Sequence, residues 1–361
     1  MQFYDFKEIE ERVILIGVQT EQDEDVAASL DELEELAATA GAVTVGKVIQ
    51  NREAVHPGTY IGKGKIEEVA ALLAAYDANG VICDDELSPA QMNNLERELD
   101  CKVMDRTLLI LDIFAGRATT SEGKIQVELA QLRYRSARLV GLRESLSRLG
   151  GGIGTRGPGE KKLETDRRLI RTRISALKAE LAQVEKHREL IRGKRTRGNL
   201  KTAAIVGYTN AGKSTLLNTL TGAGILAEDK LFATLDPTTR VLELKDGQQI
   251  LLTDTVGFIR KLPHHLVEAF KSTLEEAKYA DYIIHVVDAS NPQAELQMHT
   301  VYETLRELGA TGKKIITLLN KQDQVQGESL RDFRADYTVK CSARTGEGLE
   351  ELNDVLANLL A

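Results

Sequence analysis

The sequence predicts an α/β protein made of three parts, and three observations support this fold class. Residues 1–117 alternate apolar strands with amphipathic helices, and residues 197–361 do the same. Residues 118–196 instead contain two long apolar repeats with helical spacing on either side of a glycine-rich stretch. Because alternating strands and helices are typical of mainly parallel sheets, we expect an N-terminal α/β domain, a long antiparallel helical hairpin and a second α/β domain.

The composition agrees with a multidomain globular protein. The chain of 361 residues is long enough for two or three domains with sizeable cores. No apolar run approaches the roughly 20 residues that a membrane-spanning helix needs, and the first residues lack the order of a signal peptide. We therefore expect a soluble, cytoplasmic protein. Cys83, Cys101 and Cys341 are far apart and follow no metal-ligand spacing, so we interpret them as reduced, structural residues.

The first part is expected to begin with a buried strand at Arg12–Gln19, because this segment is almost entirely apolar. A helix over Asp25–Ala40 follows, with its apolar residues on one face and Gly41 as its C-cap. The elements predicted next are a strand at 42–50, a helix at 66–76, a strand at 80–84, a helix at 88–99 capped by Ser88, and a strand at 101–104. This order predicts a small domain with a mainly parallel sheet.

The loop at residues 56–65, HPGTYIGKGK, is the unusual feature of this first part. Two glycines and two lysines before a helix could bind a second phosphate group, but the spacing of a full phosphate loop is absent. We favour a turn that opens the helix. A role for His56 as a catalytic base has less support still.

Two apolar series run through residues 118–196. The first steps by three and four residues from Ile125 to Leu149, with one polar interruption at Ser136, and the second repeats this pattern from Leu163 to Ile191. Such spacing is typical of long helices that pack along one face. Because residues 150–159, GGGIGTRGPG, have no apolar density of their own, we expect two antiparallel helices joined by a glycine-rich tip.

The net charge of −8 conceals a basic segment. Between Gln131 and Lys201 there are 20 Lys and Arg against 7 Asp and Glu, a net charge of +13, which leaves −21 on the rest of the chain. A basic segment in an acidic protein is a suitable electrostatic footprint for nucleic acid, although a solvated face or a flexible connector is the alternative. The candidate RNA-binding residues around the tip are Arg148, Arg156, Lys161, Lys162, Arg167 and Arg168.

A phosphate-binding loop opens the third part. The apolar run Thr202–Val206 leads into Gly207-x-x-x-x-Gly212-Lys213-Ser214, and an amphipathic helix follows. Glycines leave backbone N–H groups free to surround a phosphate, Lys213 should reach the β- and γ-phosphates, and Ser214 should bind Mg²⁺. The residues assigned to nucleotide binding here are Gly207, Tyr208, Thr209, Asn210, Ala211, Gly212, Lys213, Ser214 and Thr215.

Three further motifs follow the ends of later apolar strands and predict GTP as the nucleotide. In Asp254-Thr255-Val256-Gly257 the aspartate would hold Mg²⁺ and the Gly257 N–H would sense the γ-phosphate. In Asn320-Lys321-Gln322-Asp323 the last carboxylate can accept both N–H groups on the guanine edge, which adenine cannot offer. The backbone of Ser342-Ala343-Arg344 suits the guanine carbonyl.

Together with these motifs, six segments resemble the HflX family of translation-associated GTPases over essentially the whole chain. They are HPGTYIGKGK at 56–65, DDELSPAQ at 84–91, DRTLLILDIFAGRA at 105–118, GKIQVELAQLRY at 123–134, GPGEKKLETDRR at 157–168 and LFATLDPTTR at 231–240. The resemblance implies a P-loop GTPase domain at 197–361, behind an HflX-type domain at 1–117 and the hairpin at 118–196. It also implies that segment 231–240 is switch I, with Thr234 sensing Mg²⁺ and the γ-phosphate, while Thr238 and Thr239 remain rivals on sequence alone. The switch I residues assigned to the nucleotide site are Phe232, Ala233, Thr234, Leu235 and Asp236.

The family implies partners as well. We expect a monomer that binds the 50S ribosomal subunit and the 70S ribosome, contacts ribosomal RNA through the hairpin, and splits stalled or idle ribosomes while hydrolysing GTP to GDP. One alternative is a GTP-gated assembly or binding factor for the large subunit that splits nothing. Another is a GTPase that acts on an RNA-modification enzyme.

The expected catalytic group is small. Lys213, Thr234 and Gly257 should act on the γ-phosphate, and Ser214, Thr234 and Asp254 should bind Mg²⁺. The residue after Gly257 is Phe258, where Ras-type GTPases place a water-orienting glutamine. We therefore expect slow hydrolysis by the protein alone and stimulation by ribosomes. Asn210 either shapes the loop, which we favour, or helps to bind K⁺ as in some potassium-stimulated GTPases.

Overall fold

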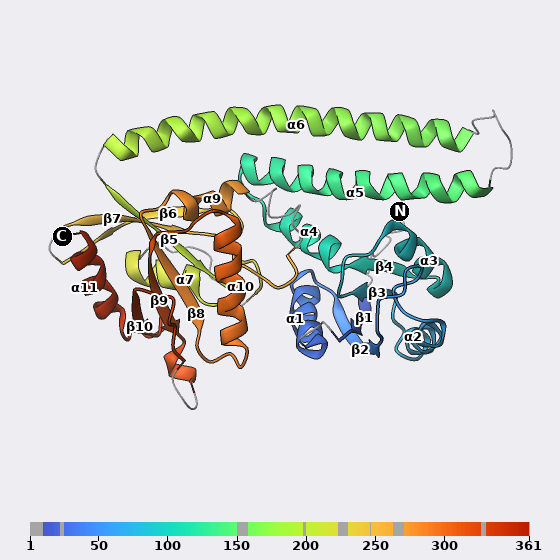
Figure 1. Cartoon of the computed structure of the whole chain (residues 1–361), viewed down its shortest axis with the longest axis horizontal. Coiled ribbons are helices and arrows are strands. Elements are labelled where there is room, and N and C mark those ends of the chain that lie inside the picture. The colour runs from blue at the N-terminus through green and yellow to red at the C-terminus, as the bar shows by residue number, and fades with distance from the viewer. Residues whose placement is uncertain are drawn as a thin grey trace, which may run out of the picture. The chain divides into compact units, whose positions relative to one another are not determined.

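The structure is a computed structural model that describes residues 10–21, 25–149, 158–197, 200–222, 230–245, 247–262, 271–325 and 330–360. The chain forms two compact units. The first consists of Met1–Ile113 with Glu128–Leu177, and the second of Phe114–Val127 with Lys178–Ala361. This division differs from the predicted three parts because each long helix contributes residues to both units. The α/β fold class is confirmed, since each unit contains its own sheet (Figure 1).

The first unit contains a four-stranded sheet in which every neighbouring pair is parallel. Its strands are β1 Arg12–Gln19, β2 Val43–Asn51, β3 Gly80–Cys83 and β4 Lys102–Asp105, in the order β2-β1-β3-β4. Its helices are α1 Val26–Thr39, α2 Lys63–Ala75, α3 Pro89–Leu99 and the first residues of α4 Arg106–Arg117. The parallel sheet predicted for this part is therefore confirmed, and helix α4 is an addition to it.

Local capping explains where the helices of the first unit begin. Asp25 accepts a hydrogen bond from the Ala28 N–H, 3.0 Å away, at the start of α1. Ser88 and Gln91 exchange side-chain and backbone hydrogen bonds at the start of α3, and Pro89 occupies its first position. Both arrangements give partners to N–H groups that a helix cannot satisfy internally.

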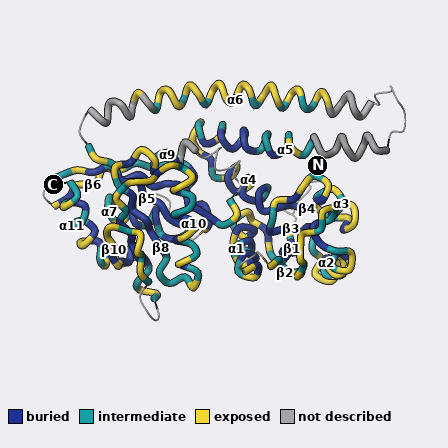
Figure 2. The backbone as a smooth tube through the Cα atoms, viewed as in Figure 1, coloured by how far each residue is buried: buried dark blue, intermediate teal, exposed yellow. Residues whose placement is uncertain are grey.

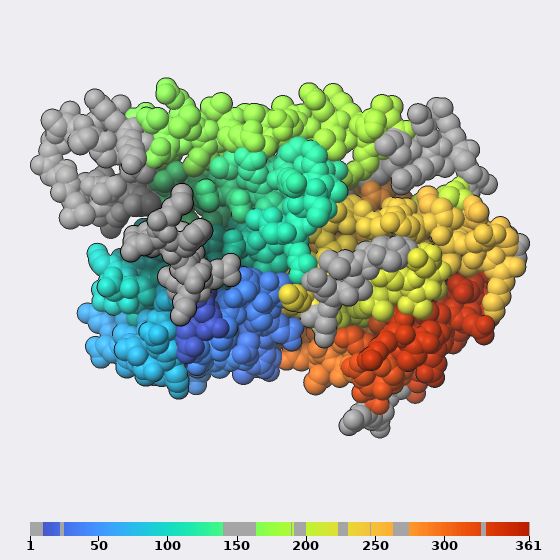
Figure 3. Space-filling model, turned by 180° about the vertical axis from the view of Figure 1, so that it is seen from behind, coloured from blue at the N-terminus to red at the C-terminus, as the bar shows by residue number. Residues whose placement is uncertain are grey.

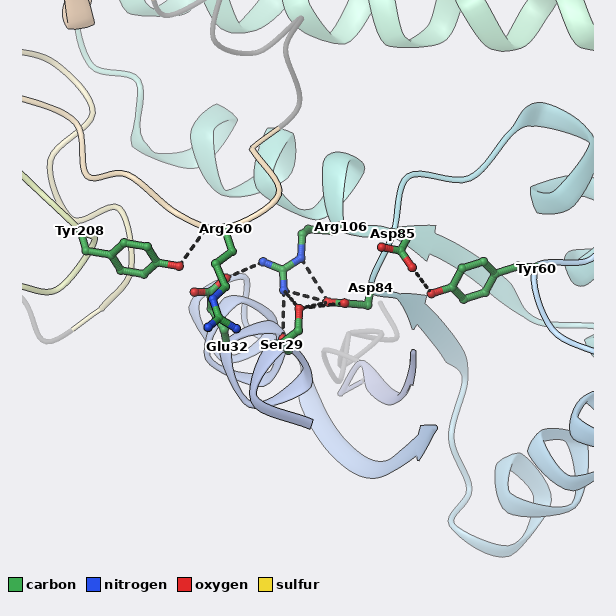
Figure 4. Close-up of polar contacts among 8 residues, drawn as sticks. All are labelled: Ser29, Glu32, Tyr60, Asp84, Asp85, Arg106, Tyr208 and Arg260. Carbon is green, nitrogen blue, oxygen red and sulfur yellow. Dashed lines mark hydrogen bonds and ion pairs between the residues drawn. The ribbon is translucent and has the colours of Figure 1, made fainter. Parts of the chain in front are cut away.

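An ion-pair cluster lies at the carboxyl ends of β3 and β4 in this unit (Figure 4). The Arg106 guanidinium, 1% exposed, lies 2.8 Å from Asp84 and 2.6 Å from Glu32. The Ser29 hydroxyl also donates to Asp84, at 2.8 Å. Because buried charges are costly without partners, these contacts fix α1 and the start of α4 against the sheet.

The second unit contains a six-stranded sheet in the order β10-β9-β8-β5-β7-β6. Only β6 runs antiparallel to its neighbour, β7, among the pairs that the described residues form. The strands are β5 Lys201–Gly207, β6 Thr238–Glu243, β7 Gln249–Asp254, β8 Tyr282–Asp288, β9 Lys314–Asn320 and β10 Tyr337–Lys340. The helices are α7 Lys213–Thr221, α9 Lys271–Tyr279, α10 Ala294–Glu307, the 3-10 turn Gln322–Gln324 and α11 Leu349–Leu360.

One apolar core joins two helices of the second unit to its sheet. Leu216 and Leu217 of α7 and Leu352 and Leu356 of α11 are fully buried in the same cluster. In the space-filling view, α7 (yellow-green) lies beside α11 (red) (Figure 3). This packing fixes the start of α7, and with it the loop at the end of β5.

The two long helices are α5 Ser121–Leu149 and α6 Pro158–Arg197. Within the first unit, Arg173 of α6 binds Glu128 of α5 at 2.7 Å, and Arg167 donates to the Leu139 carbonyl. Within the second unit, Arg188 of α6 contacts Glu122 of α5. Since partners run in opposite directions along the two helices, the predicted antiparallel pairing is confirmed. Much of α6 is exposed (Figure 2), and no helix of the described residues is long and apolar enough to cross a membrane.

Candidate nucleotide-binding site

The phosphate loop lies between the end of β5 and the start of α7, and its glycines meet steric demands. A Cβ atom on Gly207 would lie 2.2 Å from the Val286 carbonyl oxygen of β8. Gly212 has a φ of +97° and no room for a Cβ, because Asn320 Nδ2 would be 2.4 Å from it. Both positions therefore require glycine for reasons of packing, independently of any nucleotide.

A pocket opens above this loop. Most of the residues that line it come from the phosphate loop, switch I and the segment after β7. They are Thr209, Asn210, Gly212, Lys213, Ser214, Thr215, Lys230, Phe232, Ala233, Thr234, Thr255 and Gly257. Lys230 was missed by the sequence analysis, because a single lysine before switch I belongs to no recognisable motif.

Three oxygen-bearing side chains meet at one side of the pocket. The Ser214 hydroxyl lies 2.7 Å from Asp254 Oδ2 and 2.7 Å from the Thr234 hydroxyl. Asp254 is fully buried, and its other oxygen, Oδ1, has no hydrogen-bond partner among the described residues. Oxygen ligands and one buried, unsatisfied carboxylate oxygen fit a hard cation such as Mg²⁺.

The contacts of Thr238 and Thr239 distinguish them from Thr234 as candidates for the Mg²⁺-binding threonine. The Thr239 hydroxyl pairs with the Thr253 hydroxyl of the neighbouring strand β7, at 2.9 Å. Thr238 and Thr239 both belong to strand β6. Of the three threonines, Thr234 is the one that lines the pocket.

Lys213 lies at the floor of the pocket. Its Nζ atom donates to the Tyr208 carbonyl at 2.7 Å, and burial lowers the pKa of this amine to about 8. A Cβ on Gly257 would lie 2.9 Å from that Nζ atom and 2.7 Å from the Thr209 Cα. The lysine and the Gly257 backbone therefore converge on the position where a terminal phosphate is expected.

The two predicted guanine-recognition segments meet beside the phosphate loop. Asn320 donates to the Ala211 carbonyl at 2.8 Å and accepts from the Ala343 N–H at 2.8 Å, so it connects the phosphate loop to the segment 342–344. A hydrogen bond from Ser342 lowers the pKa of the exposed Asp323 carboxyl. Lys321 pairs with Asp288, at 2.7 Å. These contacts hold Asp323 as a carboxylate beside the buried backbone of Ser342 and Ala343.

Some predicted nucleotide-site residues have their described contacts elsewhere. Leu235 and Val256 are buried apolar side chains. The Asp236 carboxylate accepts hydrogen bonds from Thr119 and Thr120, which the sequence analysis did not consider. None of the three lines the pocket.

The comparisons with known proteins agree with this site. Residues 202–321 match a family described as "50S ribosome-binding GTPase", residues 27–115 match "GTP-binding GTPase N-terminal", and residues 117–195 match "GTP-binding GTPase Middle Region". A protein named "GTPase HflX" from Lacrimispora saccharolytica is 71% identical over 357 residues, which cover 99% of this chain and 84% of that protein. The chain belongs to the HflX family of GTPases.

Other HflX relatives and solved structures extend the similarity over the whole chain. "GTPase HflX" from Escherichia coli K12 is 45% identical, with 97% of this chain and 83% of that protein covered. A structure titled "crystal structure of SsGBP and GDP complex" aligns with a TM-score of 0.53 at 28% identity, covering 97% of this chain and 98% of that one. The predicted recognition of the family, the P-loop GTPase fold and the GTPase activity are confirmed.

The predicted RNA contacts of the HflX hairpin are only partly within the described residues. Arg156 lies outside them, and so do the side chains of Arg148, Lys161 and Lys162. Arg167 donates to the Leu139 carbonyl of the facing helix, at 2.6 Å, whereas Arg168 is exposed. Arg168 is therefore the described candidate that is available to a partner, and the RNA-binding role stays a prediction.

The loop at residues 56–65 has internal contacts that support the turn interpretation. His56 and Tyr60 form a short antiparallel bridge, and the Thr59 N–H donates to His56 Nδ1 at 3.1 Å. Tyr60 has a φ of +66°, and its hydroxyl donates to Asp85 at 2.7 Å (Figure 4). The His56 ring thus stabilises the turn.

Proposed function

We propose that this protein is a ribosome-binding GTPase that docks on the large (50S) ribosomal subunit and splits stalled or idle ribosomes. The observation that carries the proposal is the closed arrangement of the site, in which Thr234 of switch I reaches Ser214 of the phosphate loop at 2.7 Å. Through this contact switch I can change conformation with the bound nucleotide, so that binding to a partner can depend on GTP. Support for the partner comes from the match of residues 202–321 to a family described as "50S ribosome-binding GTPase".

In this proposal the residues of the pocket have distinct roles. Asp323 selects guanine, since its two oxygens match two N–H groups of the base, and the phosphate-loop amides surround the β-phosphate. Lys213 bonds to the terminal phosphates in place of its Tyr208 carbonyl partner. Ser214, Thr234 and Asp254 would hold Mg²⁺, which would supply positive charge to neutralise the phosphate oxygens.

Hydrolysis by the protein alone is expected to be slow. Phe258 cannot orient the attacking water, and its ring is 1% exposed and does not line the pocket. A ribosome that orders the site could supply the missing geometry, and for Ras the completion of such a site in trans accelerates hydrolysis by about 10⁵. Single-turnover hydrolysis should therefore be slow without ribosomes and strongly stimulated by 50S subunits or 70S ribosomes. A fast unstimulated rate would contradict this reasoning, and matched K⁺ and Na⁺ buffers test the Asn210 alternative.

The hairpin supplies the proposed RNA contact. Its segment from Gln131 to Lys201 has a net charge of +13 in a protein of net charge −8. Basic side chains on an exposed helix bind RNA phosphates and make the affinity depend on salt. We expect the protein to bind ribosomal RNA as a monomer through this surface.

Sucrose-gradient profiles of 70S ribosomes test the splitting function. Incubation with the protein and a non-hydrolysable GTP analogue should convert 70S particles into subunits, with the protein in the 50S peak. If the protein migrates with 50S subunits and leaves 70S particles intact, the assembly or binding factor is the better description. Affinity for transfer RNA without affinity for subunits would instead favour a role with an RNA-modification enzyme.

A matched pair of variants tests the hairpin contact. Arg168→Glu should weaken 50S binding and make its salt dependence shallower, because each lost phosphate contact removes about 0.7 to 0.9 from the slope of log K against log salt. Lys178→Glu makes the same change of charge at another exposed position of α6, ten residues farther from the tip. Equal ribosome binding by the parent and Arg168→Glu would exclude this residue from the interface.

A further inference from the structure

Switch I is bound by residues that lie outside the matched GTPase segment 202–321. The Asp236 carboxylate accepts four hydrogen bonds, from the amide and hydroxyl of Thr119 at 3.0 and 2.7 Å and from those of Thr120 at 2.9 and 2.6 Å. Both threonines directly precede helix α5, whose first N–H groups have no partner within the helix. A carboxylate at this position also interacts favourably with the helix dipole.

A glycine makes room for this carboxylate. A Cβ atom on Gly123, in the first turn of α5, would lie 2.4 Å from Asp236 Oδ1 and 3.1 Å from the Thr120 hydroxyl. Gly116 of helix α4 offers a comparison, since a Cβ there would meet nothing within 4 Å. The start of α5 is therefore shaped to receive Asp236, and we call Thr119, Thr120, Gly123 and Asp236 the switch I latch.

A second contact holds switch I on the other side of Thr234. The Phe232 ring meets the Phe114 ring of α4 edge to face, with 4.7 Å between the ring centroids. Both rings are almost fully buried. Phe232 has a φ of +55°, which is unfavourable for a bulky side chain, and its N–H donates to the Thr209 hydroxyl at 2.9 Å. The surrounding contacts must therefore maintain this conformation.

These two contacts fix the position of Thr234. It lies two residues from Phe232 and two from Asp236, and two residues of chain span at most about 7 Å. When both neighbours are held, the Thr234 hydroxyl has little freedom to leave Ser214, which it contacts at 2.7 Å. The start of α5 and the metal-binding side of the pocket are thus linked through one short segment.

We propose that Thr119, Thr120 and Gly123 are positioning residues for recognition of the triphosphate. By binding Asp236 they hold switch I in the arrangement in which Thr234 reaches the Ser214 side of the pocket, and so they raise the affinity for GTP relative to GDP. Linkage is reciprocal, so bound GTP also stabilises the latch and the first turn of α5. Arg188 of α6 contacts Glu122, which lies beside the latch in α5. Bound GTP should therefore also stabilise this contact between the two long helices.

The substitution Gly123→Ala tests the latch in the full chain. Alanine has a higher helix propensity than glycine, so the substitution should not weaken the helix itself. The added methyl group would displace the Asp236 carboxylate. We expect the dissociation constant for the non-hydrolysable analogue GMPPNP in Mg²⁺ to rise at least about fivefold, the lower end of typical coupling. The dissociation constant for GDP should stay unchanged. Gly116→Ala, which adds the same methyl group to open space, should leave both constants unchanged.

Two further measurements keep the test decisive. The variant Thr119→Val removes one of the four hydrogen bonds to Asp236 without changing side-chain shape and leaves the Gly123 N–H bonded to the Thr120 hydroxyl, and it should produce a smaller loss of the same selectivity. In the parent protein, hydrogen exchange at the Thr119 and Thr120 amides should be slower with GMPPNP than with GDP. The proposal would be overturned if the affinities for GMPPNP and GDP fell equally or if neither fell. It would also be overturned if the exchange rates of the two amides were the same with both nucleotides.

Discussion

Replacement of Phe258 by glutamine tests whether the missing water-orienting residue can simply be restored. From the sequence, Phe258→Gln recreates the Ras-type arrangement after Gly257 and should accelerate hydrolysis. The structure predicts otherwise. Phe258 is 1% exposed, its N–H donates to the Gly207 carbonyl at 3.1 Å, and its carbonyl accepts from the Thr209 N–H at 2.7 Å. This backbone is fixed in the core, and the pocket is lined by Gly257 but not by Phe258.

The magnitude follows from burial. Truncation of a buried phenylalanine to alanine costs about 3–5 kcal/mol, and glutamine restores part of the volume but buries an amide, at about 1–3 kcal/mol. We expect a net loss of about 3 kcal/mol, which for a domain of this size lowers the melting temperature by roughly 6–12 °C. Phe258→Leu keeps an apolar side chain and should lose less than half as much.

Thermal unfolding followed by circular dichroism measures the loss, and single-turnover GTP hydrolysis measures the catalytic effect. We expect Phe258→Gln to melt earlier and to hydrolyse GTP no faster than the parent protein. A faster rate together with an unchanged melting temperature would show that the side chain reaches the pocket, and would refute the assignment of Phe258 to the core.

Three other predictions follow from the described contacts. Asp323→Asn should weaken GTP binding and admit xanthosine triphosphate in a competition assay; an unchanged preference for guanine would show that another group reads the base. Burial lowers the pKa of His285 to about 4. An unfolded histidine binds a proton below about pH 6.5, so the free energy of unfolding should fall by up to about 3 kcal/mol as the pH falls from 6.5 to 4. His285→Phe should remove this pH dependence in denaturant titrations. Arg106→Met should destabilise the first unit by about 3–5 kcal/mol, because it leaves the buried Asp84 carboxylate without its positively charged partner; an unchanged melting curve would count against that ion pair.

The sequence predicted most elements because their signals are local. Ser88 and Pro89 mark a helix start through hydrogen bonds and geometry within four residues, and the structure contains that cap. Helix α4 was missed for a physical reason: Leu108–Leu111 are apolar on every side, and such a run fits a buried strand as well as a buried helix. Its packing, rather than its periodicity, decides between them.

The residues of the candidate site likewise divide into those that a local motif predicts and those that only a long-range contact identifies. The phosphate loop was predicted because glycine, lysine and serine occur within one short motif, whereas the choice of Thr234 over Thr239 depends on a hydrogen bond to a neighbouring strand. Lys230 and Thr119 have no motif at all. Thr119 meets Asp236 across 117 residues of sequence, and no local spacing can indicate a contact of that range.

The interleaved order of the two compact units has a consequence for synthesis of the chain. The first unit is complete once Leu177 has been made, but residues 114–127 belong to the second unit, whose remainder begins at Lys178. At about 5–20 residues per second, the 117 residues that separate Thr119 from Asp236 take roughly 6–23 s to translate. During that interval the Thr119 and Thr120 amides lack the Asp236 carboxylate that they bind in the folded protein. The first unit can therefore be fully synthesised before residues 114–127 have the contacts that they make in the second unit.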